Sequence, residues 1–115
     1  MPMINLKTPI DVPEPKRQSL LAALSEAVSE VTGKPEQYIM VILEKADFMM
    51  GKEAGMAAFA DIRGIGGISP EINKQLSDKI CGIIEERLAV SPSRIYINFT
   101  DVPAANWGWN KSTFG

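Results

Sequence analysis

Two stretches of the chain, residues 33–43 (GKPEQYIMVIL) and residues 90–100 (VSPSRIYINFT), read as the same structural unit. Each passes through a short connector that contains a proline, and each ends in a run of β-branched, apolar and aromatic residues typical of a strand. The two prolines, Pro35 and Pro92, stand 57 residues apart. A unit that occurs twice in this way predicts a fold built from two similar halves.

The patterns around the two stretches complete the halves. Apolar residues recur at spacings of three and four before each connector, which is typical of amphipathic helices. Gly33 stands where the first helix should end, and Ser69 followed by Pro70 is typical of a helix start. The predicted elements are strands over 2–7, 38–43, 56–65 and 95–100, helices over 16–32 and 70–88, and a glycine-containing loop over 48–55.

This β-α-β-β-α-β order predicts an α+β fold in a single domain over residues 1–115. Right-handed crossovers place both helices on the same face of one four-stranded sheet. Residues 38–43 are apolar at every position, so the second face of the sheet is expected to be apolar too. Self-association into a symmetric oligomer is the economical way to cover such a face.

Composition excludes several classes of protein. The chain has 12 basic and 14 acidic residues, a net charge of −2, and no long basic run, so neither nucleic acid nor a membrane surface is an expected partner. No stretch of 18 apolar residues and no signal-peptide pattern is present, which favours a cytoplasmic protein. The chain has no histidine, and we expect neither a metal nor a cofactor. Cys81 is the only cysteine and is expected to be a buried, inert thiol.

Pro2 follows the initiator methionine directly, at the start of the first predicted strand. One interpretation is a proline that only begins an edge strand, which the conformational rules allow. The other requires removal of Met1, which converts Pro2 into a terminal secondary amine. Terminal amines titrate near neutrality, so Pro2 would then be a candidate general base.

Four motifs occur in order along the chain: MPM at the start, TGKPEQYI, RIYINF, and NWGWNKSTF near the end. Together they resemble the macrophage migration inhibitory factor family of the tautomerase superfamily, from Pro2 to Phe114. The resemblance implies a homotrimer of β-α-β-β-α-β units, in which short strands of the C-terminal tail pair with neighbouring subunits. It also implies a cofactor-free keto–enol tautomerase whose sites lie between subunits, with a processed N-terminal proline as catalytic base.

The resemblance assigns further roles residue by residue. It implies that Lys34 binds the substrate carboxylate and lowers the pKa of Pro2, although a lysine just past a helix end is also ordinary. Asn98 would reach the substrate from the adjacent subunit, and the backbone N–H of Ile62 would contact it, while the Ile62 side chain fits core or pocket wall equally. The remaining implied pocket residues are Met3, Tyr38, Tyr96, Trp107, Trp109 and Phe114, and for the two tyrosines an interface role is the alternative.

The implied substrates are small aryl 2-oxo acids such as phenylpyruvate, with dopachrome-like compounds as a second class. The chain departs from the animal members in three ways: Trp107 replaces a small aliphatic residue, EAGMAAF lacks the CxxC pair, and the receptor-binding arginine and aspartate have no clear match. Redox activity is therefore not expected, and receptor signalling loses support. The alternative is a cytokine-like or host-directed binding protein with a vestigial tautomerase site, and secretion without a signal stays open.

Overall fold

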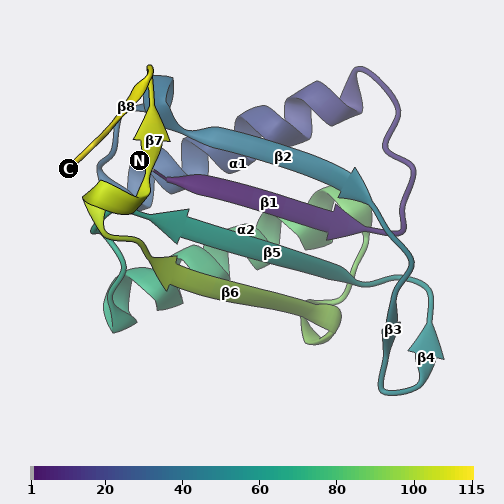
Figure 1. The fold of residues 1–115 in the computed structure, drawn as a ribbon. Coiled ribbons are helices and arrows are strands. Elements are labelled where there is room, and N and C mark those ends of the chain that lie inside the picture. The colour runs from purple at the N-terminus through teal and green to yellow at the C-terminus, as the bar shows by residue number, and fades with distance from the viewer. Residues whose placement is uncertain (1) are drawn as a thin grey trace.

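Two helices and four long strands follow one another in the predicted order (Figure 1). The computed structural model describes residues 2–115. The elements are β1 (Met3–Thr8), α1 (Lys16–Thr32), β2 (Met40–Lys45), β5 (Ala58–Gly64), α2 (Pro70–Leu88) and β6 (Ile95–Asp101). Neither helix combines the length and apolar character needed to cross a membrane, as far as residues 2–115 are concerned.

The four strands form one mixed sheet in the order β2-β1-β5-β6. β1 pairs with β2 in parallel, β5 pairs with β6 in parallel, and β1 and β5 join the halves as antiparallel neighbours. Each parallel pair is linked through a helix, and both helices lie behind the sheet in Figure 1. The predicted α+β architecture of two split β-α-β units is thereby confirmed.

The core lies between the helices and the sheet. Ile4 and Leu6 of β1 are fully buried, and they alternate with outward residues along the strand. Helix residues spaced by three and four fill the other side of the core: Leu20, Leu24, Val28, Leu76, Ile80 and Ile84. Burying each of these side chains stabilises the fold by about 1.5–3 kcal/mol. The one buried polar side chain among the described residues, Thr8, donates its hydroxyl to the Ala57 carbonyl at 2.9 Å.

Two local predictions were wrong. The strand expected over 38–43 begins at Met40, because a 3₁₀ turn, η1 (Glu36–Tyr38), follows Pro35 and takes Tyr38 out of the sheet. The loop expected over 48–55 instead contains a hairpin of β3 (Met49–Met50) and β4 (Glu53–Ala54). Gly51 and Lys52 both have positive φ there, as a tight hairpin turn requires.

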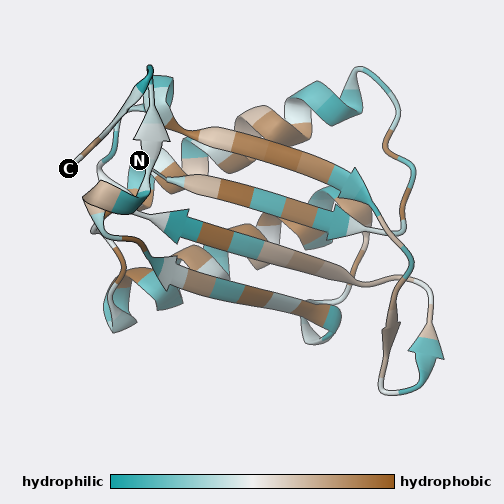
Figure 2. Ribbon diagram, in the orientation of Figure 1, coloured by the Kyte–Doolittle hydropathy of each residue, from teal (hydrophilic) through white to brown (hydrophobic). Residues whose placement is uncertain are grey.

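The face of the sheet away from the helices is of mixed polarity, so the expected apolar second face was also wrong. Met40 and Ile42 of β2 do point to this face, since their register partners are the outward residues of β1. The polar residues on this face are Asn5, Lys7, Glu44, Asp61, Arg63, Asn98 and Thr100, and Met3, Phe59 and Tyr96 add apolar or aromatic positions. Figure 2 shows polar and apolar residues alternating along β1, β5 and β6, as expected where successive side chains point to opposite faces.

The C-terminal tail folds back on its own chain. Its strands β7 (Gly108–Trp109) and β8 (Ser112–Thr113) pair with each other as an antiparallel hairpin. Asn110 and Lys111 make the turn, both at positive φ. Figure 1 shows this hairpin at the edge of the sheet where β1 begins, so the two ends of the chain lie close together.

Both helices end in a left-handed residue, which allows a matched stability test. Gly33 has φ 73° and Ala89 has φ 56°, and each cap N–H bonds back to its own helix. Gly33→Ala should lower the free energy of unfolding by about 1 kcal/mol, and Ala89→Gly should raise it by about 0.5–1 kcal/mol.

Gly82 of α2 provides the control, because nothing lies within 4 Å of an added Cβ and its φ is ordinary. Gly82→Ala should stabilise the fold by up to about 1 kcal/mol through helix propensity. Urea unfolding measures all three variants. A stabilising Gly33→Ala would show that the left-handed conformation does not control the end of α1.

Candidate active site

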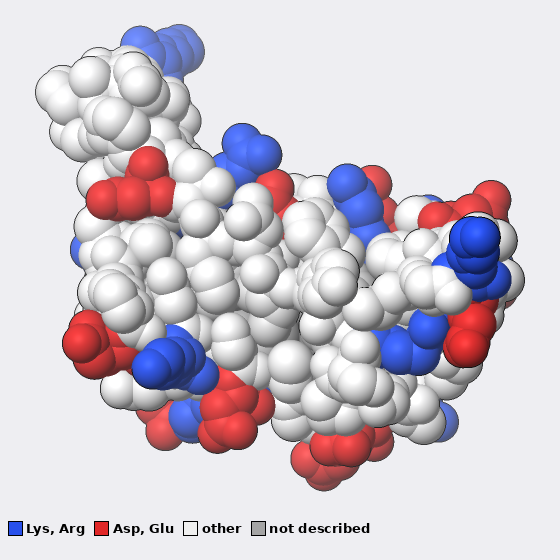
Figure 3. All heavy atoms as spheres, turned by 90° about the horizontal axis from the view of Figure 1, so that it is seen from below, with Lys and Arg blue, Asp and Glu red and all other residues white. Residues whose placement is uncertain are grey.

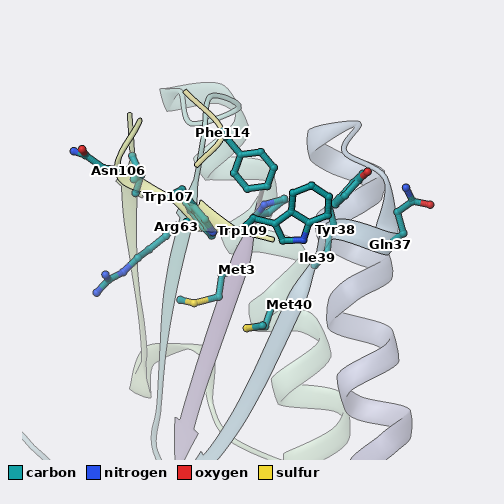
Figure 4. Close-up of a pocket in the computed structure, with 13 residues that line it drawn as sticks. Met3, Gln37, Tyr38, Ile39, Met40, Arg63, Asn106, Trp107, Trp109 and Phe114 are labelled. Atoms are coloured by element: carbon teal, nitrogen blue, oxygen red, sulfur yellow. The ribbon is translucent and has the colours of Figure 1, made fainter. Parts of the chain in front are cut away.

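A cavity of about 700 Å³ opens where β1 begins, between η1 and the C-terminal tail (Figure 4). Its wall brings together residues from the first few positions, the middle and the last positions of the chain. The lining residues are Pro2, Met3, Gln37, Tyr38, Ile39, Met40, Arg63, Val102, Asn106, Trp107, Gly108, Trp109 and Phe114. Cavities of this size, mostly apolar with a few polar groups, are typical ligand sites.

Pro2 is buried in the wall of this cavity. Its carbonyl accepts a hydrogen bond from the Met40 N–H at 3.2 Å, which extends the parallel pairing of β1 and β2 by one step. β1, which follows Pro2, lies between β2 and β5, so Pro2 is anchored at the start of an inner strand. The second residue of the chain is therefore an interior residue.

Three aromatic rings form one side of the cavity. The Trp109 ring packs edge-to-face on Tyr38, with centroids 5.8 Å apart, and stacks on Phe114 at 5.4 Å. Such pairs each contribute about 0.5–1.5 kcal/mol beyond area burial. The Phe114 N–H donates to the Trp107 carbonyl at 3.1 Å, which holds the end of the tail in place. Trp109 is still 52% exposed, so this side of the cavity remains accessible.

Met3 and Met40 lie beneath the aromatic rings, on adjacent strands (Figure 4). Thioether side chains adapt to the shape of a neighbour and contact aromatic rings favourably. The aromatic side of the cavity is thus an apolar slot bounded by flat rings and flexible methionines. A planar ring would fit it without leaving polar groups unpaired.

Six of the predicted site residues line the cavity, and four do not. The six are Pro2, Met3, Tyr38, Trp107, Trp109 and Phe114. The Lys34 ammonium donates to the Ile65 carbonyl at 3.3 Å and is not part of the wall. Ile62 is 1% exposed on the helix side of the central strand β5, so its side chain belongs to the core.

Tyr96 and Asn98 also lie outside this chain's cavity. Both point away from the helices on the edge strand β6, and Tyr96 is 67% exposed. The resemblance placed Asn98 in the site of a neighbouring subunit. A position on an edge strand is compatible with that role, which stays a prediction because a single chain does not test it.

The sequence analysis missed seven lining residues: Gln37, Ile39, Met40, Arg63, Val102, Asn106 and Gly108. Arg63 is the informative one among them, because it is the register partner of Met3. The alternation of side chains along ADIRG could have placed Arg63 on the face of the sheet opposite to that of the buried Ile62. Only the pairing of β5 with β1, however, brings Arg63 to the cavity. Within residues 2–115, no three His, Cys, Asp or Glu side chains come together as metal ligands.

Cys81 of α2 is partly buried, not fully buried as predicted. Burial raises the pKa of its thiol, and the carboxylates of Asp78 and Glu85 raise it further. Because the thiolate is the reactive form, alkylation by iodoacetamide should be slower in the folded protein than in urea, with a half-maximal rate at higher pH.

Variants at the neighbouring carboxylates check the cause of this slow reaction. Asp78→Asn and Glu85→Gln should each lower the pKa of Cys81 and speed alkylation at pH 8. Rates followed by mass spectrometry should stay unchanged in Glu26→Gln, whose carboxylate is on α1 and is not among the groups that shift this thiol. Equal alkylation rates of Cys81 in the folded and unfolded chains would contradict a raised pKa of this thiol in the folded protein.

A family model of macrophage migration inhibitory factor (MIF) matches residues 1–115. The chain belongs to the MIF family. MIF of Meriones unguiculatus is 39% identical over 118 residues, covering 99% of both chains. The crystal structure of a MIF homologue from Prochlorococcus marinus matches with a TM-score of 0.93 and 35% identity, over 98% of this chain and 99% of that one.

A second structure, that of Pt0534 inactivated by 2-oxo-3-pentynoate, has a TM-score of 0.86 and 18% identity, over 96% of this chain and 93% of that one. At that identity the match shows the fold alone. The resemblance to the MIF family and the α+β fold are thus confirmed, and the protein is MIF-like.

Proposed function

We propose that the protein is a cofactor-free keto–enol tautomerase of small aryl 2-oxo acids such as phenylpyruvate, with dopachrome-like compounds as a second substrate class. The observation that supports this most is the position of Pro2, buried in the wall of a cavity beside a three-ring aromatic slot. Removal of Met1 would place a secondary amine there, next to an apolar site of the right size for an aryl ring.

Pro2 is the general base of the proposed reaction. Burial disfavours the charged form of an amine, so its pKa should fall below the usual range of a terminal amine. The neutral amine then takes a proton from the carbon next to the substrate carbonyl, and the electron pair of that C–H bond moves to form the enolate. Protonation of the enolate oxygen completes the enol, and the reverse order of steps gives the ketone.

The substrate carboxylate is proposed to bind Lys34. Its ammonium already points toward the segment after β5, where it bonds the Ile65 carbonyl. A homotrimer would bring Asn98 and Tyr96 of a neighbour to the other end of the substrate, and these side chains are exposed on an edge strand. The aryl ring would lie against the cluster of rings formed by Tyr38, Trp109 and Phe114, with Trp107 narrowing the opening.

A second candidate function is cytokine-like or host-directed binding with a weak tautomerase site. The observation that favours it is the name of the relatives, since macrophage migration inhibitory factor describes an effect on cells. The two functions separate in a variant without the Pro2 amine, because receptor binding would survive that change and catalysis would not.

Ketonisation of enol phenylpyruvate, followed by ultraviolet absorbance, tests the catalytic proposal. The chain that begins at Pro2 should be active, and Pro2→Gly should reduce kcat/KM by about 10²-fold or more, because a flexible primary amine replaces the rigidly positioned secondary amine. Pro13→Gly is the matched control, since Pro13 lies in the connector before α1 and away from this cavity. It should leave the rate within about two-fold.

A chain with one alanine inserted between Met1 and Pro2 distinguishes the contribution of the free terminal amine from that of the proline ring. It keeps the proline side chain but converts its nitrogen into an amide with no useful basicity. This version should be as inactive as Pro2→Gly. The proposal would be contradicted if the alanine-inserted chain folded to the same oligomeric size as the chain that begins at Pro2 and had the same activity. Binding would then be the better-supported function.

The electrophile 2-oxo-3-pentynoate provides a readout that does not depend on turnover. A neutral Pro2 amine should add to its conjugated alkyne, so the adduct gains the whole mass of the reagent and the amine loses its proton to the reagent carbon. Peptide mass spectrometry should locate the adduct on Pro2. Labelling spread over lysines, with no preference for Pro2, would contradict a neutral amine in the cavity.

A further inference from the structure

Arg63 supplies the only formal charge on the wall of the cavity, counted over residues 2–115. Its Cα is the register partner of Met3 on the adjacent strand, so Arg63 and Pro2 are separated by about one strand spacing and one residue. Lys34, by contrast, directs its ammonium to the Ile65 carbonyl outside the wall. An anionic group that enters the cavity away from Lys34 therefore meets Arg63.

The cavity has two unlike sides. Figure 4 shows Phe114, Trp109 and Tyr38 on one side, and the side chains of Arg63 and Asn106 directed away from them on the other. A ligand that spans both sides would have an aromatic part in the slot and a polar or anionic part beyond it.

The guanidinium of Arg63 has hydrogen-bond donors to spare. Its Nε and Nη2 both donate to one oxygen of Asp61, Oδ2, at 3.3 and 3.1 Å. Of the five N–H groups of an arginine, three remain, including both on Nη1. The side chain is 53% exposed, so the free edge of the fork is open to a carboxylate, which guanidinium groups bind through two parallel hydrogen bonds.

Asp61 orients the guanidinium of Arg63 but leaves the edge that contains Nη1 free to bind another group. The pair uses Oδ2 only, and Oδ1 of Asp61 is buried with no hydrogen-bond partner in the described part of the chain. A second carboxylate at the free edge would share the same guanidinium, which is a common arrangement for arginine. Asp61 is therefore a positioning residue, and its charge opposes the binding of a further anion.

On the face that Figure 3 displays, basic and acidic side chains are interspersed, without a large patch of one sign. Among the described residues that line the cavity, Arg63 is the one with a charged side chain, so the attraction for an anion inside the cavity comes from this side chain.

We infer that Arg63 binds a second anionic group of the ligand and selects 2-oxo acids that carry a second carboxylate at the far end of an aromatic ring. The inference rests on the proposed function for the reaction itself, but the preference for a dianion is a property of binding. It concerns a residue that the sequence motifs did not single out.

Binding is measured by tryptophan fluorescence, because both tryptophans of the chain line the cavity. The probes are phenylacetate, a monoanion, and 4-carboxyphenylacetate, a dianion that differs from it by a second carboxylate at the para position, and neither can enolise as a 2-oxo acid. The protein should bind the dianion about 10-fold or more tightly than the monoanion, as a charge-assisted pair of hydrogen bonds allows.

Substitutions test whether Arg63 causes the preference for the dianion. In Arg63→Met the affinities for the two probes should lie within about two-fold of each other. Arg63→Lys should show a preference between those of Arg63→Met and the unaltered protein, and Asp61→Asn should increase the preference. Arg17→Met is the control, since Arg17 pairs with Glu14 at the start of α1 and lies outside the cavity. No preference in the unaltered protein, or one that survives Arg63→Met, would overturn the inference. So would a changed oligomeric state of Arg63→Met in sedimentation, because Arg63 would then be an interface residue.

Kinetics separate this inference from the proposed function. With phenylpyruvate and 4-carboxyphenylpyruvate as substrates, Arg63→Met should raise KM for the dianion about 10-fold more than it raises KM for the monoanion, and it should change kcat far less than KM. If neither substrate reacts but the dianion preference in fluorescence depends on Arg63, the proposed function fails and the inference stands. If both react equally and bind equally, the inference fails and the proposed function stands.

Discussion

The hydrogen bond from the Met40 N–H to the Pro2 carbonyl, at 3.2 Å, fixes the start of the chain inside the molecule. It continues the parallel pairing of β1 with β2, and β5 holds the other side of the same strand. Because β1 is an inner strand of the sheet, Pro2 directly before it is buried. The cavity, its aromatic side and the tail that closes it are all arranged around Pro2.

Most of the fold follows from local patterns in the sequence. Helical spacing and the caps at Gly33 and Ser69 predicted both helices, and the repeated connector predicted the two halves. The errors occurred where short-range patterns compete. Tyr38 belongs to an apolar run, yet Pro35 starts a 3₁₀ turn that removes it from the strand and turns its ring toward Trp109. The mixed polarity of the second face was missed because its polar residues lie mostly at outward positions of the other three strands.

The candidate site could be predicted only where the resemblance named its residues. The aromatic side was found from NWGWNKSTF, since those residues are close together in the sequence. Arg63 was not found, because its place depends on the register between β5 and β1, which no single strand specifies. Lys34, Tyr96 and Asn98 lie off this chain's cavity, and a role for the last two depends on a neighbouring subunit.

If Pro2 is the catalytic base, its terminal amine must be neutral at physiological pH, and the burial of Pro2 is expected to make it so. A pH titration of the ¹⁵N-labelled Pro2 amine by NMR, on the chain that begins at Pro2, measures this directly. The account predicts a pKa clearly below the value of about 7.7–8.0 that is usual for a terminal amine. A pKa at or above that range would contradict it, because the amine would then be charged and could not accept a proton.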